Sequence, residues 1–163
     1  MTLAEVFNPN MIKVGLESDD KDELFEEMVQ VIVDADSSIS RDKILESIKQ
    51  RESLMSTGIM HDVAVPHGRS DAVKKVVGCI GISKKGIDYD SLDSDPVHIV
   101  FMLIYSPSFG ERGLQIFKKL ATILGDVSFR QELLSQNSAN GIYDVLCRYE
   151  DRLGDWYVRN WCY

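Results

Sequence analysis

The sequence predicts a mixed α/β fold, in which a mixed β-sheet is flanked by helices on both faces as a three-layer α/β/α sandwich. Two observations support this prediction. Segments with helical periodicity come both before and after a group of short apolar segments, so helices are available to cover both faces of a sheet. Residues 96–105 are apolar at odd and even positions alike, apart from His98, which is typical of a central strand covered on both faces.

The first part of the chain predicts one strand and two helices. Residues 11–16 alternate between apolar and polar types, as in a strand with one buried face. Asp19 and Asp20 then offer carboxylates for the start of a helix, whose apolar residues recur at helical spacing and end near Ala35. Ser40 is suited to cap a second amphipathic helix.

The next segment changes character at Arg51. Residues 51–58 are too polar to continue the second helix and end in glycine. Val63–Val65 predicts a short strand that stops at Pro66, because proline lacks a backbone donor for the sheet. We therefore expect His67 and Gly68 on a loop just past the end of this strand.

The rest of the chain predicts further strands followed by helices. Residues 76–83 form another apolar run, and residues 86–95 are rich in turn formers. Three amphipathic stripes follow, separated by short turns at residues 125–126 and 137–138. We expect one domain over residues 1–150 and a separate aromatic tail over residues 151–163, which could dock on the body or on another subunit.

Composition limits the classes of function. The chain has 163 residues, 44% of them hydrophobic, enough for one domain whose core needs no disulfide or metal. It carries 18 Lys and Arg against 26 Asp and Glu, a formal net charge of −8, which argues against nucleic acid as a partner. The sequence has no secretory pattern and no run of roughly 20 apolar residues, so we expect a cytoplasmic protein without a membrane span.

Metal and cofactor sites are not expected. The three cysteines share no C-x-x-C spacing, and no phosphate-binding loop of nucleotide hydrolases occurs. His61 precedes Asp62 and invites a metal-site interpretation, but Pro66 breaks the strand periodicity that would bring His61 and His67 to one face. We expect His61 on a surface loop and His98 inside the sheet.

His67 is the candidate for covalent chemistry. A neutral imidazole is a nucleophile near pH 7 when a hydrogen bond holds the proton on its other nitrogen, and it can then accept a phosphoryl group. The phosphoryl charge requires arginine forks, hydroxyls and backbone N–H groups. Residues of these types surround His67 in the sequence: Arg51, Ser56, Thr57, Gly68 and Arg69. Composition alone leaves a second interpretation open, in which P-H-G is only a turn and both arginines are solvated surface cations.

The order of the motifs provides a family resemblance. R-E, S-T-G and A-V-P-H-G-R follow one another between Arg51 and Arg69, and G-I-D-Y-D-S-L-D occupies residues 86–93. Over roughly residues 2–147 the chain resembles the enzyme IIA domain of the fructose/mannitol and nitrogen-regulatory branch of the bacterial phosphotransferase system. The stretch at residues 86–93 resembles the nitrogen-regulatory members, which are free-standing domains.

This resemblance implies a site and partners. It implies that His67 accepts a phosphoryl group from a histidine-containing phosphocarrier protein, with Arg51 beside it and with Ser56 and Thr57 in the S-T-G turn. In the family a second histidine usually starts the helix after the central strand, and here Gly113 stands at that position.

Three functions follow as alternatives. The first is a regulatory phosphorelay protein whose binding to a target depends on a transient phosphohistidine. The second is a sugar-specific carrier that passes the phosphoryl group to a IIB partner. The third is a degenerate module that only binds proteins, with Gly113 as the sign of lost transfer.

Overall fold

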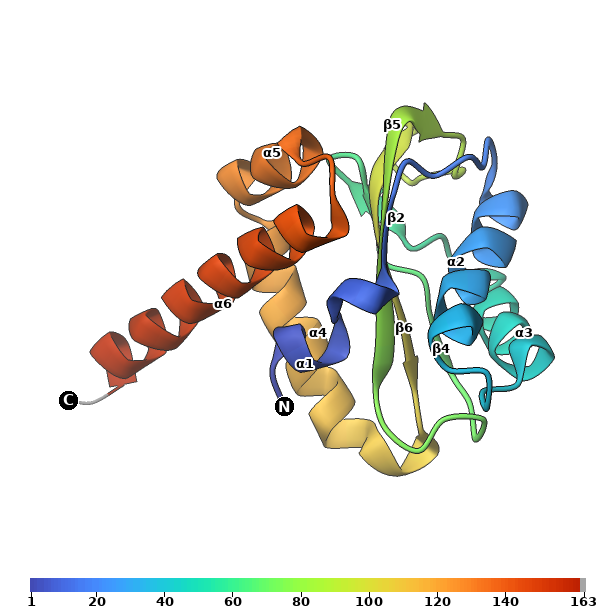
Figure 1. Cartoon of the computed structure of the whole chain (residues 1–163), viewed down its shortest axis with the longest axis horizontal. Coiled ribbons are helices and arrows are strands. Elements are labelled where there is room, and N and C mark those ends of the chain that lie inside the picture. The colour runs from blue at the N-terminus through green and yellow to red at the C-terminus, as the bar shows by residue number, and fades with distance from the viewer. Residues whose placement is uncertain (162–163) are drawn as a thin grey trace.

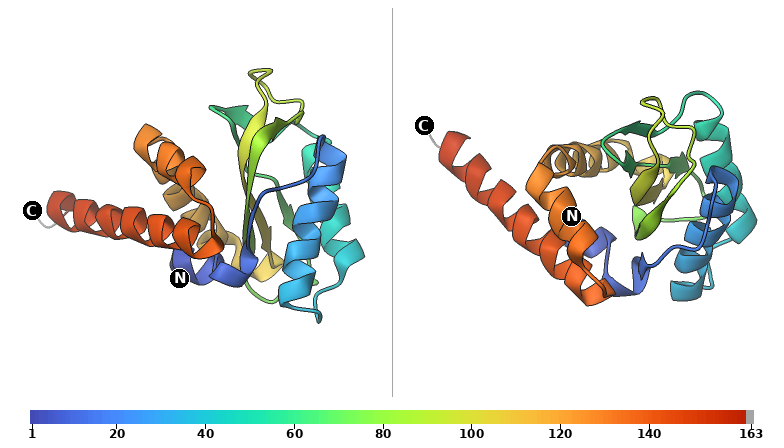
Figure 2. Two further views of the ribbon diagram at one scale, coloured as in Figure 1. Left: turned by 45° about the horizontal axis from the view of Figure 1, so that its top comes forward. Right: turned by 90° about the horizontal axis from the view of Figure 1, so that it is seen from above.

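One mixed sheet lies at the centre of the molecule, between two helical layers (Figure 1). The structure, a computed structural model, describes the backbone of residues 1–161 and the side chains of residues 1–59 and 61–154. Two helices cover one face of the sheet: α2 (Lys21–Ala35) and α3 (Arg41–Glu52). Four cover the other: α1 (Leu3–Val6), α4 (Gly110–Leu124), α5 (Val127–Ser135) and α6 (Ala139–Trp161). The two further views in Figure 2 show the same layers, so the predicted three-layer fold is confirmed.

Within residues 1–161, six strands form the sheet. They are β1 (Ile12–Val14), β2 (Gly58–Met60), β3 (Val63–Ala64), β4 (His67–Arg69), β5 (Val77–Ile87) and β6 (Val97–Tyr105). The main path runs β1-β5-β6-β3-β2. Strand β6 pairs antiparallel with β5 along one edge, while β3 and then β4 pair parallel with it along the other. This arrangement confirms the prediction of a central strand over residues 96–105.

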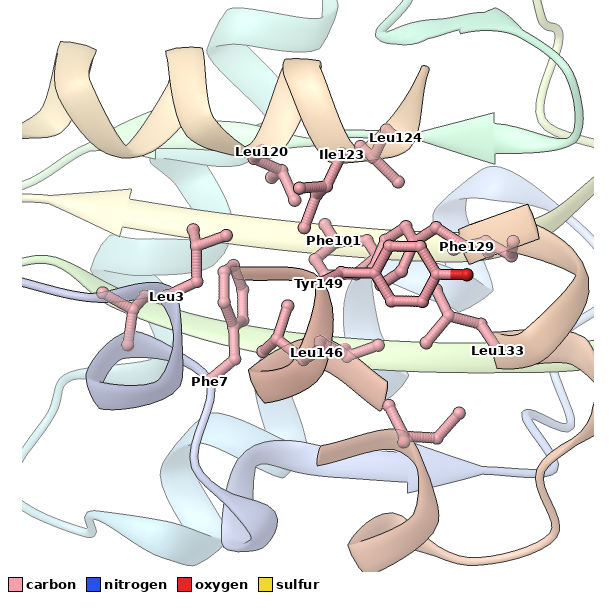
Figure 3. Packing of buried hydrophobic residues seen from close by; sticks show 14 of the residues in the cluster. Leu3, Phe7, Phe101, Leu120, Ile123, Leu124, Phe129, Leu133, Leu146 and Tyr149 are labelled. Atoms are coloured by element: carbon pink, nitrogen blue, oxygen red, sulfur yellow. The ribbon is translucent and has the colours of Figure 1, made fainter. Parts of the chain in front are cut away.

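The side chains of β6 alternate between two hydrophobic cores. Phe101 and Leu103 belong to the core under α1, α4, α5 and α6, whereas Val100 and Met102 belong to the core under α2 and α3. All four side chains are fully buried. In the first core the ring of Phe7 meets the ring of Phe101 edge to face, with centroids 5.2 Å apart (Figure 3). The two cores explain why β6 is apolar at odd and even positions.

The structure differs from the sequence predictions around His67. Helix α3 continues through Arg51 to Glu52, so that Arg51 lies in its last turn. His67 is not in a loop but begins strand β4, opposite Leu103 of β6. Pairing with β6 continues past Pro66 because the Pro66 carbonyl accepts a hydrogen bond from the Leu103 N–H over 3.0 Å. This contact needs no backbone donor from the proline.

Several short elements have no counterpart in the sequence predictions. These are α1, β2 and two 3₁₀ turns, η1 (Pro9–Met11) and η2 (Pro107–Phe109). Each spans only three or four residues, which is too short for a hydrophobic period to emerge.

Helix α6 passes through the predicted boundary at residue 150 without a break and extends away from the rest of the molecule (Figure 1). The predicted docking of the aromatic tail concerns side chains after residue 154, which lie outside the described residues. Along residues 1–161, no helix is both long and apolar enough to cross a membrane.

Candidate functional site

The His67 side chain is held between a helix and the central strand. In the sheet, His67 of β4 pairs with Leu103 of β6. The imidazole ring of His67 packs edge to face against the ring of Phe117 from α4, with centroids 4.9 Å apart. The side chain is partly buried, because α4 covers this side of the sheet. His67 therefore presents its ring from a rigid strand and not from a flexible loop.

Two hydrogen bonds define the state of the imidazole. Nδ1 lies 2.9 Å from the carbonyl oxygen of Val65, which can only accept, so Nδ1 carries the proton. Nε2 then has the lone pair, and it accepts a hydrogen bond from Nε of Arg51 over 3.1 Å. Burial of the ring lowers the pKa of His67 below its ordinary value of 6.5; the bond to Val65 opposes this shift, and the charge of Arg51 adds to it. At neutral pH the ring is thus uncharged, with Nε2 as the nucleophilic atom.

Arg51 is itself held in place by a backbone group. Its Nη1 donates to the carbonyl oxygen of Met55 over 3.0 Å, while its Nε donates to His67. The two donors of one planar guanidinium thus join the end of α3, the following loop and the histidine. The result is a fixed positive charge beside Nε2.

A cleft of about 280 Å³ opens in front of His67. Its lining is largely apolar and comes from the β2–β3 hairpin, the following strand end and α4: Ile59, Val63, Val65, Phe117, Leu120 and Leu124. Arg51, Ser56, Thr57 and His61 add polar groups to the same lining. The exposed side chains of Met55 and Ile59 stand at this cleft, so its surroundings are apolar as well.

The two hydroxyl residues of the S-T-G turn differ in their bonding. Ser56 Oγ accepts a hydrogen bond from the Gly58 N–H over 3.3 Å. Thr57 is buried, and its Oγ1 donates to Glu52 Oε2 over 2.6 Å. The Thr57 hydroxyl hydrogen is therefore used in an internal bond to Glu52. Ser56 Oγ only accepts in its bond with Gly58, so the Ser56 hydroxyl hydrogen is not used there. Sequence reasoning places Glu52 only within the motif R-E, because a single buried carboxylate at a helix end gives no periodic signal.

Gly68 and Arg69 do not line the cleft in front of His67. A Cβ atom on Gly68 would lie 2.8 Å from the backbone carbonyl carbon of Ser47, so glycine permits α3 to approach β4. The exposed side chain of Arg69 lines a different hollow, together with Lys43 and Asp71. Of the sequence candidates, the structure thus brings Arg51, Ser56 and Thr57 to the cleft of His67.

Comparison with known proteins identifies the family. Residues 5–149 match the family model described as "Phosphoenolpyruvate-dependent sugar phosphotransferase system, EIIA 2". The chain belongs to this EIIA family. The resemblance inferred from the sequence motifs is therefore confirmed.

The relatives include sugar-specific and nitrogen-regulatory proteins. The chain is 33% identical to the "PTS system fructose-specific EIIABC component" of Bacillus subtilis over 92% of its own length, but it spans only 24% of that relative. It is 32% identical to the "PTS system fructose-specific EIIA component" of Haloferax volcanii, over 77% of this chain and 82% of the relative. The solved "Nitrogen Regulatory Protein IIA-Ntr from Neisseria meningitidis" has 30% identity and a TM-score of 0.82, with 88% of this chain and 98% of that chain covered.

In this EIIA chain the other two histidines lie around the β2–β3 hairpin. His61 and Asp62 form its turn with positive φ angles of 54° and 68°, and exposed His61 also lines the cleft. His98 lies in β6 with Nδ1 4.0 Å from Asp62 Oδ1. Among the side chains that the structure describes, no three His, Cys, Asp or Glu residues gather as a metal site would require.

The position of the family's second histidine is close to the site. Gly113 lies in α4 four residues before Phe117, so both residues share one face of the helix. A Cβ atom on Gly113 would lie 3.8 Å from Tyr105 Cγ, an ordinary contact. Arg112 does not replace the imidazole, because its guanidinium lies over the ring of Phe109, 5.5 Å from the centroid.

Proposed function

We propose that this EIIA protein accepts a phosphoryl group on Nε2 of His67 from a histidine-containing phosphocarrier protein and acts mainly in nitrogen-type regulation. The observation that carries the proposal is the pair of hydrogen bonds on the imidazole. The Val65 carbonyl keeps the proton on Nδ1, and Arg51 lies at Nε2, where a phosphoryl group would add its negative charge.

The transfer needs no additional base. The lone pair of Nε2 forms the new P–N bond, while the P–N bond to the donor imidazole breaks and its electron pair returns to the donor nitrogen. The proton on Nδ1 stays in place, and the Val65 carbonyl stabilises the positive charge that develops on the ring. Atoms and charge are balanced between the two imidazoles.

Charge compensation is assigned to Arg51 and Ser56. The Arg51 guanidinium lies 3.1 Å from Nε2 and is released from it when the P–N bond forms, after which it can bind the phosphoryl oxygens. Ser56 lines the cleft and supplies a hydroxyl donor. Thr57 supports the turn, since its hydroxyl donates to Glu52. Gly68 and Arg69 lie outside the lining of the cleft, so we assign them no contact with the phosphoryl group.

The regulatory role is supported by the likeness to IIA-Ntr, which covers 98% of that chain with a TM-score of 0.82. A sugar-specific role is the second candidate, because two relatives at 33% and 32% identity are named as fructose-specific. In that role the phosphoryl group passes from His67 to a IIB partner. The two roles share the first transfer and differ in the second.

The first transfer is tested with purified components. The protein is incubated with phosphoenolpyruvate, the general phosphotransferase enzyme and the phosphocarrier, and an acid-labile phosphoryl group is measured on the wild type, His67→Ala and His61→Ala. We expect label on the wild type and on His61→Ala, which keeps the candidate acceptor but removes the other histidine of the cleft. Unlabelled wild type would leave the protein-binding module as the remaining function, and equal label on His67→Ala would move the acceptor elsewhere.

The second transfer separates the two roles. The phosphorylated protein is mixed with a fructose-type IIB domain, and loss of the label is followed over time. We expect the label to remain on His67 over minutes in the regulatory role. Rapid transfer to IIB would support the sugar-specific role instead.

A further inference from the structure

A buried carboxylate lies directly behind the cleft, at the end of α3. Glu52 is 8% exposed and follows Arg51 in the chain. Its Oε1 accepts a hydrogen bond from the Thr57 N–H over 3.0 Å, and its Oε2 accepts one from Thr57 Oγ1 over 2.6 Å. Nζ of Lys21 lies 3.4 Å from Oε1 and compensates the negative charge. Glu52 thus ties Thr57 to the helix end through two separate bonds.

Thr57 connects this carboxylate to the imidazole. The Thr57 carbonyl accepts a hydrogen bond from the Val65 N–H over 3.1 Å. The Val65 carbonyl in turn accepts the Nδ1 proton of His67 over 2.9 Å. Pro66 lies between Val65 and His67 and restricts the backbone conformation of both itself and Val65. The position of the Val65 carbonyl is therefore set mainly by the bond between Val65 and Thr57.

The loop between Glu52 and Thr57 also holds the Arg51 side chain in place. Residues 53–56 lie between Glu52 and Thr57, and within them the Met55 carbonyl accepts a hydrogen bond from Arg51 Nη1 over 3.0 Å. Because Glu52 fixes the end of this loop, it restrains the acceptor that orients the guanidinium. The two hydrogen-bond partners of the His67 ring, Val65 and Arg51, therefore both depend on the Glu52 carboxylate. Among the described contacts, Glu52 makes no direct hydrogen bond to either of them.

We infer that Glu52 is a positioning residue, which fixes His67 in its Nδ1–H tautomer through Thr57 and Val65. Its effect on the rate rests on the proposed function, whereas the tautomer is a property of the protein before any phosphoryl transfer. Glu52 is buried behind the loop, so it makes no contact with the phosphoryl group. It acts by keeping the lone pair on Nε2, the nitrogen that faces Arg51.

The test reads the tautomer and the rate separately. Long-range ¹H–¹⁵N NMR correlations assign the protonated nitrogen of His67 in the wild type and in Glu52→Ala. We expect a single Nδ1–H tautomer in the wild type and a mixture of both tautomers in the variant, with phosphorylation slowed about tenfold. If the wild type accepts no phosphoryl group, the proposed function fails, and the tautomer measurement still decides this inference.

Glu150→Ala is the matched control. Glu150 is a carboxylate of the same kind on the opposite face of the sheet: it accepts from the backbone N–H groups of Leu3 and Ala4 over 2.6 and 3.1 Å and pairs with Lys119. Its removal costs a similar set of contacts far from His67, so we expect the wild-type tautomer. An equal tautomer change in both variants would overturn the inference, because general destabilisation would then explain it.

Two further variants keep the inference testable. Glu52→Gln retains an acceptor for the Thr57 N–H and is expected to recover most of the Nδ1–H population. If Glu52→Ala does not fold, Thr57→Val keeps the Thr57 N–H bond to Glu52 and removes the hydroxyl that donates to Glu52 and lies 2.8 Å from Tyr89 Oη; it is expected to mix the tautomers in the same direction. A wild-type tautomer in a folded Glu52→Ala, or in Thr57→Val where the first does not fold, would overturn the inference.

Discussion

Nε of Arg51 donates a hydrogen bond to Nε2 of His67 over 3.1 Å, although the two residues lie on different elements, a helix end and a strand. The lone pair that we propose as the nucleophile is therefore occupied by a cation in the resting protein. Phosphoryl transfer requires this bond to break and allows the guanidinium to bind the phosphoryl oxygens instead. In the proposed transfer, Arg51 thus contacts His67 beforehand and the phosphoryl oxygens afterwards.

Arg51→Lys is expected to slow the phosphorylation of His67 by about 10- to 100-fold, the equivalent of one charge-assisted hydrogen bond. A lysine ammonium is a point donor and cannot reproduce the planar fork that joins His67 to Met55. Single-turnover transfer from the phosphocarrier measures the rate. Arg69→Lys is the comparison, and we expect a smaller loss because Arg69 lies outside the cleft lining. Equal losses would show that both arginines serve the transfer.

The pKa of His67 is expected to lie below 6.5, because burial of the ring disfavours its charged form. NMR titration of the ring measures this value, and Arg51→Gln is expected to raise it by removing the neighbouring positive charge. A midpoint at or above 6.5 in the wild type would contradict the burial argument.

The same pKa shift predicts how stability depends on pH. The unfolded chain takes up a proton on His67 at a higher pH than the folded protein does, so the free energy of unfolding falls as pH drops through 6.5 toward the folded pKa. Urea unfolding of the wild type and of His67→Gln at pH 7 and pH 5.5 measures this contribution. The variant is expected to lose less stability over this range, and an identical loss would contradict the prediction.

Gly113→His is expected to fold and to accelerate phosphoryl transfer. The Cβ position is free of clashes, and Gly113 shares the helix face of Phe117, which contacts the ring of His67. The added imidazole supplies a donor near the site. Gly113→Ala is the matched control: it raises helix stability by about 0.5–1 kcal/mol without adding a donor. An unchanged rate in Gly113→His, or the same gain in both variants, would count against a role for the imidazole.

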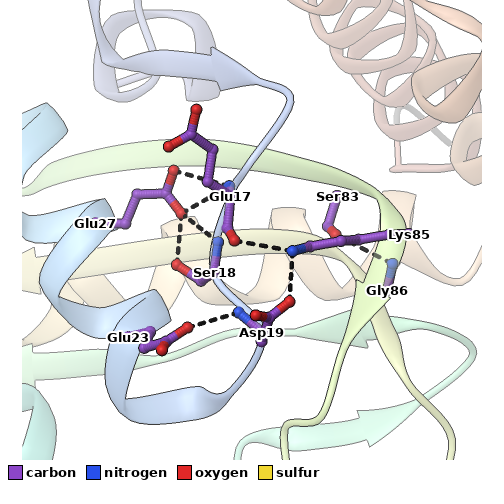
Figure 4. A network of polar contacts seen from close by, with 8 residues as sticks. All are labelled: Glu17, Ser18, Asp19, Glu23, Glu27, Ser83, Lys85 and Gly86. Carbon is purple, nitrogen blue, oxygen red and sulfur yellow. Dashed lines mark hydrogen bonds and ion pairs between the residues drawn. The ribbon is translucent and has the colours of Figure 1, made fainter.

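Glu27→Gln is expected to destabilise the connection between β1 and α2 (Figure 4). Burial of the Glu27 carboxyl works against its ionisation, but hydrogen bonds from Lys13, Ser18 and the Glu17 N–H outweigh it and hold its pKa at about 2. Glu27→Gln replaces these hydrogen bonds to a charged carboxylate, and we expect the free energy of unfolding at pH 7 to fall by about 1.5–3 kcal/mol.

Urea unfolding of both proteins against pH checks this expectation. The advantage of the wild type should be complete above pH 4.5 and should shrink as pH falls toward 2, because the folded carboxylate is then protonated. Glu23→Gln is the control, an exposed carboxylate that accepts one hydrogen bond from the Asp19 N–H in the same network. A difference that stays constant with pH would contradict the assignment of the pKa.

The sequence alone was sufficient for the layers of the fold and for the family. Residues 96–105 could be recognised as a central strand because burial on both faces leaves a pattern in consecutive residues. The motifs around His67 could be recognised because they are contiguous. The apolar pattern and the motifs both lie in consecutive residues, so each can be recognised without knowing which segments contact one another in the folded protein.

Only the tertiary structure decided the contacts of the site. The sequence proposed Arg51 and Arg69 alike, and the structure brings only Arg51 into contact with His67. It also converts the expected loop at His67 into a strand, since parallel pairing with β6 continues past Pro66. These outcomes depend on the register between distant segments and on a helix that runs two residues further, to Glu52, than its polarity suggests. No periodicity along the chain records such relationships, because they arise from packing and not from local preference.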